Sequence, residues 1–157
     1  MTLLADYRAA RRIEVVARLR RALALRALVA AGTSQREIAA ALGISQPAVS
    51  QQLSTASALD EVDARTLLEA AAPVLVRIAA DRGFSRLAVF GSVGRETARP
   101  DSDIDLLVEA PTDASIADVT HLRETFETVL GRPVDLVTYG GLHPTRDASI
   151  LTHPRAL

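Results

Sequence analysis

Asp103 and Asp105 are separated by a single residue, Ile104, and an apolar stretch follows them. If this segment is a β-strand, side-chain alternation places both carboxylates on one face and Ile104 on the other. Two carboxylates on one face repel each other unless a hard cation lies between them. Mg²⁺ takes one or two protein carboxylates and keeps its other positions for water and phosphate oxygens. The pair therefore predicts a magnesium site that receives a phosphate-bearing ligand.

A phosphate site is predicted upstream, at Gly91 and Ser92, directly after the apolar residues 86–90. Glycine has no side chain, so the backbone at this point can approach a phosphate closely. Ser92 offers a hydroxyl and an amide at the start of a short helical turn, where anions bind readily. Gly-Ser and the aspartate pair are separated by ten residues.

This segment, FGSVGRETARPDSDIDLLVE, resembles the nucleotidyltransferase (DNA polymerase β-like) superfamily, whose signature is Gly-Ser, ten residues and Asp-x-Asp. The resemblance is closest to the small MNT-type nucleotidyltransferases and extends over about residues 64–152. It implies a third carboxylate at Asp135, and it matches Arg95 and Arg146 to arginines of the family.

The resemblance also implies cofactors and roles. In-line displacement at an α-phosphate uses metal ions that lie roughly 3.5–4 Å apart in two-metal sites. We therefore expect two Mg²⁺ ions and an NTP substrate, ATP, with Asp135 accepting the proton of the attacking hydroxyl. The expected catalytic and metal-binding residues are Asp103, Asp105 and Asp135. The expected nucleotide-binding residues are Gly91, Ser92 and Arg95.

The first third of the chain predicts three helices. A long helix is expected over residues 6–31, which lack Gly and Pro. Ser34 and Glu37 form the pattern of a capping box, which starts a second helix that ends before Gly43. A third helix is expected over about residues 46–53.

Two short helices around a glycine turn are typical of a helix-turn-helix, and residues 35–53 resemble the units of bacterial transcription factors. A helical hairpin that only packs or dimerises is the alternative. The residues expected to pack together are Ile38, Leu42, Val49 and Leu53 against Leu25, Leu28 and Val29.

A double-stranded DNA operator is the partner that this resemblance implies. The third helix would enter the major groove. Gln46, Ser50 and Gln51 would then face base edges, since glutamine can pair bidentately with adenine. Arg36 and some N-terminal arginines would meet phosphates, which position the protein without specifying a sequence.

The predicted fold class is α+β: an all-helical helix-turn-helix domain over residues 1–57 and a small nucleotidyltransferase domain with a mixed sheet over 58–157. The boundary is placed at the small polar residues 54–57. Pro73 is expected to start a fresh helix, because a proline inside a helix removes a hydrogen bond. The remaining expected elements are helices over 60–71, 74–82 and from Thr112 or Asp113 to Leu130, and strands over 86–90, 104–109 and 134–138.

Charge is divided unevenly over the 157 residues. Residues 1–57 carry eight arginines and three carboxylates, a balance of +5, and residues 58–157 carry ten arginines and sixteen carboxylates, a balance of −6. The basic part suits a polyanion. The chain has no cysteine, which excludes disulfides and thiolate metal sites, and its apolar runs are too short for a bilayer. We expect a soluble, cytoplasmic protein with no membrane partner.

Three functions compete. The resemblance favours an antitoxin that adenylylates a HEPN-type toxin and represses its own operon. A catalytically inactive DNA-binding regulator with a nucleotide-sensing or dimerising domain is the alternative, because Glu96 adds an anion near the phosphate loop. A toxin-like transferase acting on tRNA ends is the third. We also expect a homodimer through the long helix, where Val16, Leu19 and Leu23 recur on one face.

Overall fold

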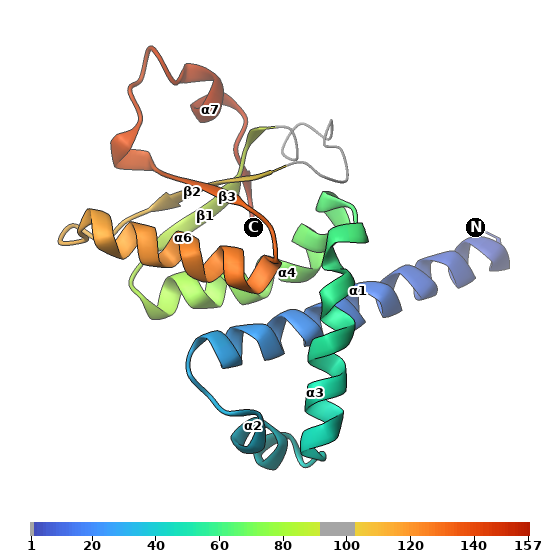
Figure 1. Cartoon of the computed structure of the whole chain (residues 1–157). Coiled ribbons are helices and arrows are strands. Elements are labelled where there is room, and N and C mark those ends of the chain that lie inside the picture. The colour runs from blue at the N-terminus through green and yellow to red at the C-terminus, as the bar shows by residue number, and fades with distance from the viewer. Residues whose placement is uncertain (1, 92–102) are drawn as a thin grey trace.

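The computed structural model describes residues 2–91 and 103–157 (Figure 1). In chain order the elements are α1 (Leu3–Ala30), α2 (Gln35–Leu42), α3 (Gln46–Thr55), the 3-10 helix η1 (Ala56–Glu61), α4 (Ala64–Asp81), β1 (Ser85–Val89), β2 (Ile104–Glu109), α6 (Ile116–Leu130), β3 (Val134–Thr138), the 3-10 helix η2 (Tyr139–Gly141), α7 (Ala148–Thr152) and β4 (Arg155–Ala156).

The strands form a four-stranded mixed sheet in the order β3-β2-β1-β4. β2 pairs with β3 in parallel, and β1 pairs with β2 and β4 antiparallel. The predicted fold class, a helical N-terminal region with a mixed-sheet α/β domain, is confirmed. β2 and β3 have their predicted bounds, and β1 begins one residue earlier than expected. The short strand β4 was not predicted.

Helices cover one face of the sheet in two layers (Figure 1). α4 and α6 pack against the strands, α1 crosses beneath both helices, and α2 and α3 lie on the far side of α1. Phe126 of α6 and Leu75 of α4 are fully buried in the core of the sheet, together with Leu106 of β2. Leu23 of α1 belongs to the same core, so this core crosses the predicted domain boundary. The boundary itself stays a prediction.

The dimer face predicted on α1 is wrong. Val16 and Leu23 are 8% and 0% exposed, and Leu19 packs against the same core. Val16 and Leu23 belong to the core that α1 shares with α4, α6 and the sheet, and Leu19 packs against it, so this apolar face is covered within the chain itself. A homodimer would have to use another surface.

The start of α2 follows the prediction closely. Ser34 Oγ accepts the Glu37 N–H at 3.2 Å, and the Glu37 carboxylate accepts the Ser34 N–H at 2.8 Å. Gly43 ends the helix at φ 65°, a left-handed conformation that favours glycine. Both halves of the expected capping box are therefore present.

The core beneath α2 and α3 is smaller than predicted. It consists of Leu25, Ile38, Ala39 and Val49, with Leu53 packed against it. The expected members Leu28, Val29 and Leu42 are 41%, 41% and 54% exposed. Only a narrow stripe of apolar side chains on α1 contacts α2 and α3, because the opposite side of α1 packs against α4 and α6.

Pro73 does not start a helix as predicted but lies inside α4. Proline has no N–H, so the carbonyl of Glu69 loses its helical donor. Arg20 of α1 supplies donors at this point: its Nη2 lies 3.3 Å from the Glu69 carbonyl and its Nε 3.2 Å from that of Ala70. A contact from another helix thus allows α4 to continue through the proline.

The cap of α6 also differs from the prediction, which named Thr112 or Asp113. Ser115 caps the helix, since its Oγ accepts the Asp118 N–H at 3.2 Å and Asp118 accepts the Ser115 N–H at 2.8 Å. This second capping box begins the helix later than expected. The helix ends at Leu130, as predicted, and the following Gly131 is left-handed, with a φ of 69°.

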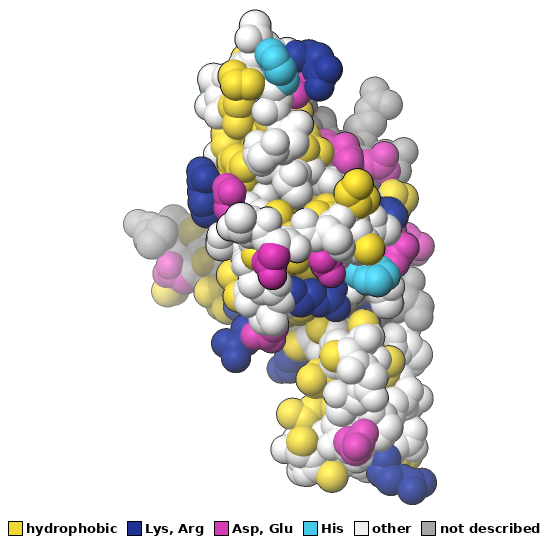
Figure 2. All heavy atoms as spheres, turned by 90° about the vertical axis from the view of Figure 1, so that its left-hand side faces the viewer, with side chains coloured by type: hydrophobic (Ala, Val, Ile, Leu, Met, Phe, Trp, Pro, Cys, Tyr) yellow, Lys and Arg dark blue, Asp and Glu magenta, His cyan; other side chains and the backbone are white. Residues whose placement is uncertain are grey.

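On the α6 side of the molecule, acidic, basic and hydrophobic side chains are interspersed and no single sign of charge dominates (Figure 2). Within residues 2–91 and 103–157, no helix is long and apolar enough to cross a membrane.

Candidate active site

Three strands bring the predicted chemical residues to one end of the sheet. Gly91 follows the end of β1, Asp105 lies near the start of β2, and Asp135 lies near the start of β3. Asp105 and Asp135 are Cα partners in the parallel β2–β3 ladder, so their side chains are neighbours on one face. The adjacent Leu106 faces the helices and the core. The two carboxylates therefore lie on the sheet face that points away from α4 and α6.

Gly91 holds the end of β1 close to Asp105. Its φ is +70°, and a Cβ built on it would lie 2.0 Å from Oδ2 of Asp105. Nearby, the Phe90 N–H donates to the Asp105 carbonyl at 3.0 Å. Any side chain at residue 91 would displace the Asp105 carboxylate and also strain the backbone. The structure thus explains why residue 91 is a glycine: a Cβ there would collide with the Asp105 carboxylate.

Main-chain contacts fix the beginning of β3. The Ile104 N–H donates to the Pro133 carbonyl at 3.3 Å, and the Val134 N–H donates to Glu127 Oε1 at 3.1 Å. Glu127 also forms an ion pair with Arg123 at 3.0 Å. The role of Glu127 was missed, because an exposed-looking Glu–Arg pair one helical turn apart gives no signal of a contact with a strand.

The other predicted site residues lie just before β2, in the tail before α7 or outside the described part of the chain. Asp103 lies one residue before β2 and is exposed. Ser92 and Arg95 lie outside the described residues. Arg146 is exposed in the tail before α7, with its Nε 3.7 Å from Oδ1 of the neighbouring Asp147.

The donor chemistry at this edge fits Mg²⁺. Asp105 is half-buried and Asp135 exposed, so both can reach an ion on the open face, and carboxylate oxygens are the ligands that Mg²⁺ prefers. Within the described ranges, no group of three or more His, Asp or Glu side chains is gathered to hold a metal. The assignment of all three aspartates to metal ions stays a prediction.

The side chains predicted to meet DNA lie on the surface of α2 and α3. Arg36, Gln46, Ser50 and Gln51 are exposed, while Val49 between them is fully buried against α1. The Gln46 side-chain amide donates to that of Gln35 at 2.9 Å, which links the two helices. The outer face of α3 is therefore polar and accessible.

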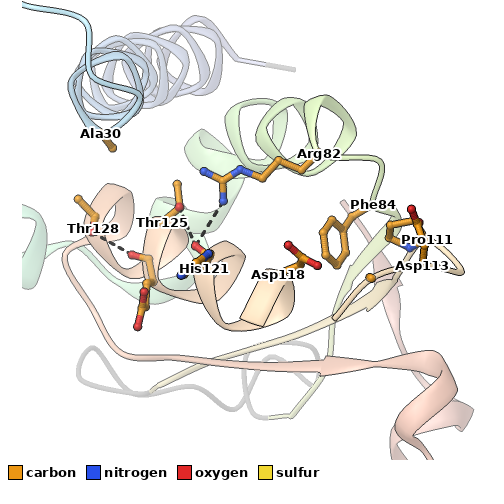
Figure 3. A pocket seen from close by; sticks show the side chains of 11 residues that line it. Ala30, Arg82, Phe84, Pro111, Asp113, Asp118, His121, Thr125 and Thr128 are labelled. Carbon is orange, nitrogen blue, oxygen red and sulfur yellow. Dashed lines mark hydrogen bonds between the residues drawn. The ribbon is translucent and has the colours of Figure 1, made fainter. Parts of the chain in front are cut away.

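A depression of about 700 Å³ lies at the other end of the sheet (Figure 3). It is lined by Phe84 before β1, Pro111 after β2 and residues of α6. Arg82 donates to the His121 carbonyl at 3.3 Å, and Thr125 Oγ1 donates to the same oxygen at 2.8 Å. No predicted site residue lines this depression, so it is separate from the carboxylate edge.

Comparison with known proteins matches the part of the chain that forms the sheet. Residues 75–156, which contain all four strands of the sheet, match the family model described as a nucleotidyltransferase domain. A Methanocaldococcus jannaschii protein named as a protein adenylyltransferase is 38% identical over 79 residues, 50% of this chain and 81% of the relative. A protein adenylyltransferase of Thermococcus cleftensis is 40% identical over 60 residues, 38% of this chain and 61% of the relative. A solved structure described as a minimal nucleotidyltransferase has a TM-score of 0.55 and 35% identity, covering 61% of this chain and 97% of its own.

Proposed function

The chain belongs to the nucleotidyltransferase family, and from this premise we propose that it transfers AMP from ATP to a macromolecular acceptor. The observation that carries the proposal is the in-register pair Asp105–Asp135, with Gly91 packed against the Asp105 carboxylate. The names of the relatives, which are protein adenylyltransferases, support AMP as the group and protein as the acceptor.

Asp103, one residue before β2, and Asp105 would hold one Mg²⁺, and Asp135 on β3 would complete the site of a second ion, which shares Asp105. Metal ions bound here would neutralise charge on the α-phosphate and on the leaving pyrophosphate. The acceptor hydroxyl oxygen forms a bond to the α-phosphorus, the bond from that phosphorus to the bridging oxygen breaks, and pyrophosphate leaves with the electron pair. Asp135 would take the hydroxyl proton. Gly91, with Ser92 and Arg95, would hold the β- and γ-phosphates.

Aspartate variants test the transfer. Asp105→Asn and Asp135→Asn should each lower AMP incorporation from α-labelled ATP by at least about 100-fold, as losses of groups that stabilise transition-state charge do. Asp113→Asn, an exposed aspartate of the separate depression, is the matched control and should transfer like the parent. The assay follows label on the protein itself and on the product of the neighbouring gene. Transfer at the parent rate by Asp105→Asn would refute the assignment.

We propose that α2 and α3 are a helix-turn-helix that binds a DNA operator. The capping box, the left-handed Gly43 and the buried Val49 support this, because together they present Gln51, Ser50 and Arg36 outward. Binding should weaken steeply with salt, since phosphate contacts release counterions. Gln51→Ala should cost about 1–3 kcal/mol on an operator and less on random DNA, with Gln52→Ala as the control.

A wider role follows from combining both activities. We propose an antitoxin that adenylylates a HEPN-type toxin and represses its own operon as a homodimer in the cytoplasm. A DNA-binding regulator whose second part only senses nucleotide remains the rival function. It is distinguished by the labelled-ATP assay, because a regulator of that kind binds ATP without transferring AMP.

A further inference from the structure

Arg132 is buried, with 7% of its surface exposed, at the junction between α6 and β3. Its Nη2 donates to the carbonyl of Leu59 at 2.7 Å and to that of Asp60 at 3.3 Å. The same nitrogen donates to the carbonyl of Val62. One guanidinium thus binds the carbonyls around the end of η1, 70 to 73 positions earlier in the chain.

These carbonyls accept hydrogen bonds from a donor elsewhere in the chain, and that of Leu59 also accepts the Val62 N–H at 3.2 Å. The last carbonyls of a helix have no partner within it, and buried ones must find another donor. All three bonds come from Nη2, whose two N–H groups must share the three carbonyls, and the guanidinium stays charged. Burying its charge is tolerable only with such hydrogen bonds. Arg132 is therefore tied to residues 59–62 by the requirements of both partners.

The position of Arg132 in the chain connects this tie to the carboxylates. Pro133 follows, and its carbonyl accepts the Ile104 N–H of β2. Asp135 is three residues from Arg132 and lies opposite Asp105. A shift of Arg132 would move the Pro133 carbonyl and, with it, the first residues of β3. The β2–β3 register that pairs the two carboxylates begins at Val134, two residues after this arginine.

We infer that Arg132 is a positioning residue of the transfer reaction: by anchoring the start of β3 to residues 59–62, it holds Asp135 beside Asp105. For the metal this inference rests on the proposed function, whereas the anchoring of β3 is independent of it. This role requires no contact between Arg132 and nucleotide or metal. Its effect is on the geometry of the carboxylate pair.

The experiment compares Arg132→Met and Arg132→Lys with Arg26→Met. Arg26 is the matched control, because it also donates from its guanidinium to a main-chain carbonyl, that of Thr128, but on α6 and not on β3. Mn²⁺ binding in the presence of a nonhydrolysable ATP analogue is followed by electron paramagnetic resonance. Hydrogen exchange of residues 59–62 and 134–138 is followed by mass spectrometry, and thermal unfolding measures stability.

Arg132→Met should weaken Mn²⁺ binding about 10–100-fold, the range found for residues that orient metal ligands, and should speed exchange in 134–138. Arg132→Lys keeps the charge and part of the donor set, so it should recover some of both properties. It also serves as the test variant if Arg132→Met does not fold. Arg26→Met should bind Mn²⁺ within twofold of the parent, even with a similar loss of stability.

Unchanged Mn²⁺ binding and unchanged exchange in 134–138 for a folded Arg132 variant would overturn the inference. Equal loss of Mn²⁺ binding in Arg132→Met and Arg26→Met would overturn it too, since a general loss of stability would then explain both. If the parent itself bound no Mn²⁺, the proposed function would fail, and the exchange data would still decide whether Arg132 anchors β3.

Discussion

The α2–α3 unit and the sheet lie on opposite sides of α1 and differ in how much core supports them. Leu25, Ile38, Ala39 and Val49 form the core beneath α2 and α3. The sheet shares one large core with α1, α4 and α6, in which Phe126 is fully buried. Stabilisation grows with the apolar area removed from water. The unit proposed to read DNA should therefore open at lower free energy than the part that carries the carboxylates.

Both regions nevertheless start a helix with the same device. Ser34 with Glu37 opens α2, and Ser115 with Asp118 opens α6. The local hydrogen bonds have the same lengths in the two boxes, 3.2 Å to each serine Oγ and 2.8 Å to each carboxylate. Because the caps are alike, a difference in stability between the two helix starts measures the contribution of the core beneath each of them.

The largest effect is expected from the centre of the large core. Phe126→Ala should lower the free energy of unfolding by about 3–5 kcal/mol, because it removes a buried ring and leaves a cavity. Urea unfolding followed by circular dichroism measures the change. Ile116→Ala, at a side chain 89% exposed on the same helix, is the control and should stay within about 0.5 kcal/mol of the parent. A loss below about 1 kcal/mol for Phe126→Ala would mean that the large core is loosely packed.

A smaller and more local effect is expected beneath α2. Ile38 is 2% exposed, so Ile38→Ala should destabilise the α2–α3 unit by about 2–5 kcal/mol. Hydrogen exchange should rise over residues 35–55 and stay at the parent level in residues 104–109 and 134–138. Leu42→Ala, at a side chain 54% exposed, is the control. Faster exchange in the strands as well would show that the two regions open together, against the comparison.

Local patterns were enough to predict much of the fold. The strands at 104–109 and 134–138 were found with their bounds because each is a compact apolar run between turn residues. Ser34, Glu37 and Gly43 were assigned correctly because caps depend on neighbours three or four positions away. β4 was missed, since two residues carry no alternation and become a strand only by pairing with β1.

Contacts between distant segments limited the rest. Periodicity showed that Leu19 and Leu23 share an apolar face, but not that the core of the same chain covers it. The sequence predicts a helix start at Pro73, whereas α4 continues through it, because the donors from Arg20 come from another helix. Among eighteen arginines, nothing in the sequence distinguishes Arg132.

In the candidate site too, local spacing was predictable from the sequence and contacts between distant segments were not. The spacing of Gly91 and Asp105 indicated that they act together, and the structure adds that a Cβ at residue 91 would lie 2.0 Å from Asp105 Oδ2, which excludes a side chain there. Asp135 was predicted as a site residue only because the chain resembles the nucleotidyltransferase family. Its position opposite Asp105 follows from the parallel register of β2 and β3, which no local pattern specifies.

The smallest expected effect is a loss of protection from hydrogen exchange at the two capping boxes when the pH is lowered. The hydrogen bonds from Ser34 lower the pKa of Glu37 below its ordinary value, and those from Ser115 lower the pKa of Asp118. Because each folded pKa is lower than the unfolded one, each carboxylate stabilises its helix start above its ordinary pKa. This contribution is lost as the pH falls through the lowered folded value.

We therefore expect the amides at the start of α2 to lose protection from hydrogen exchange when the pH is lowered from about 6 to about 3, through the ordinary carboxyl range. The start of α6 should lose less, because Leu122 and Phe126 hold that helix in the large core after its cap is protonated. Protection factors corrected for intrinsic exchange, measured for the parent, Glu37→Gln and Asp118→Asn, give the comparison. Glu37→Gln should remove most of the pH dependence at α2, since its amide does not titrate. Equal losses at α2 and α6 would show that the cap, and not the core beneath it, determines the stability of both helix starts.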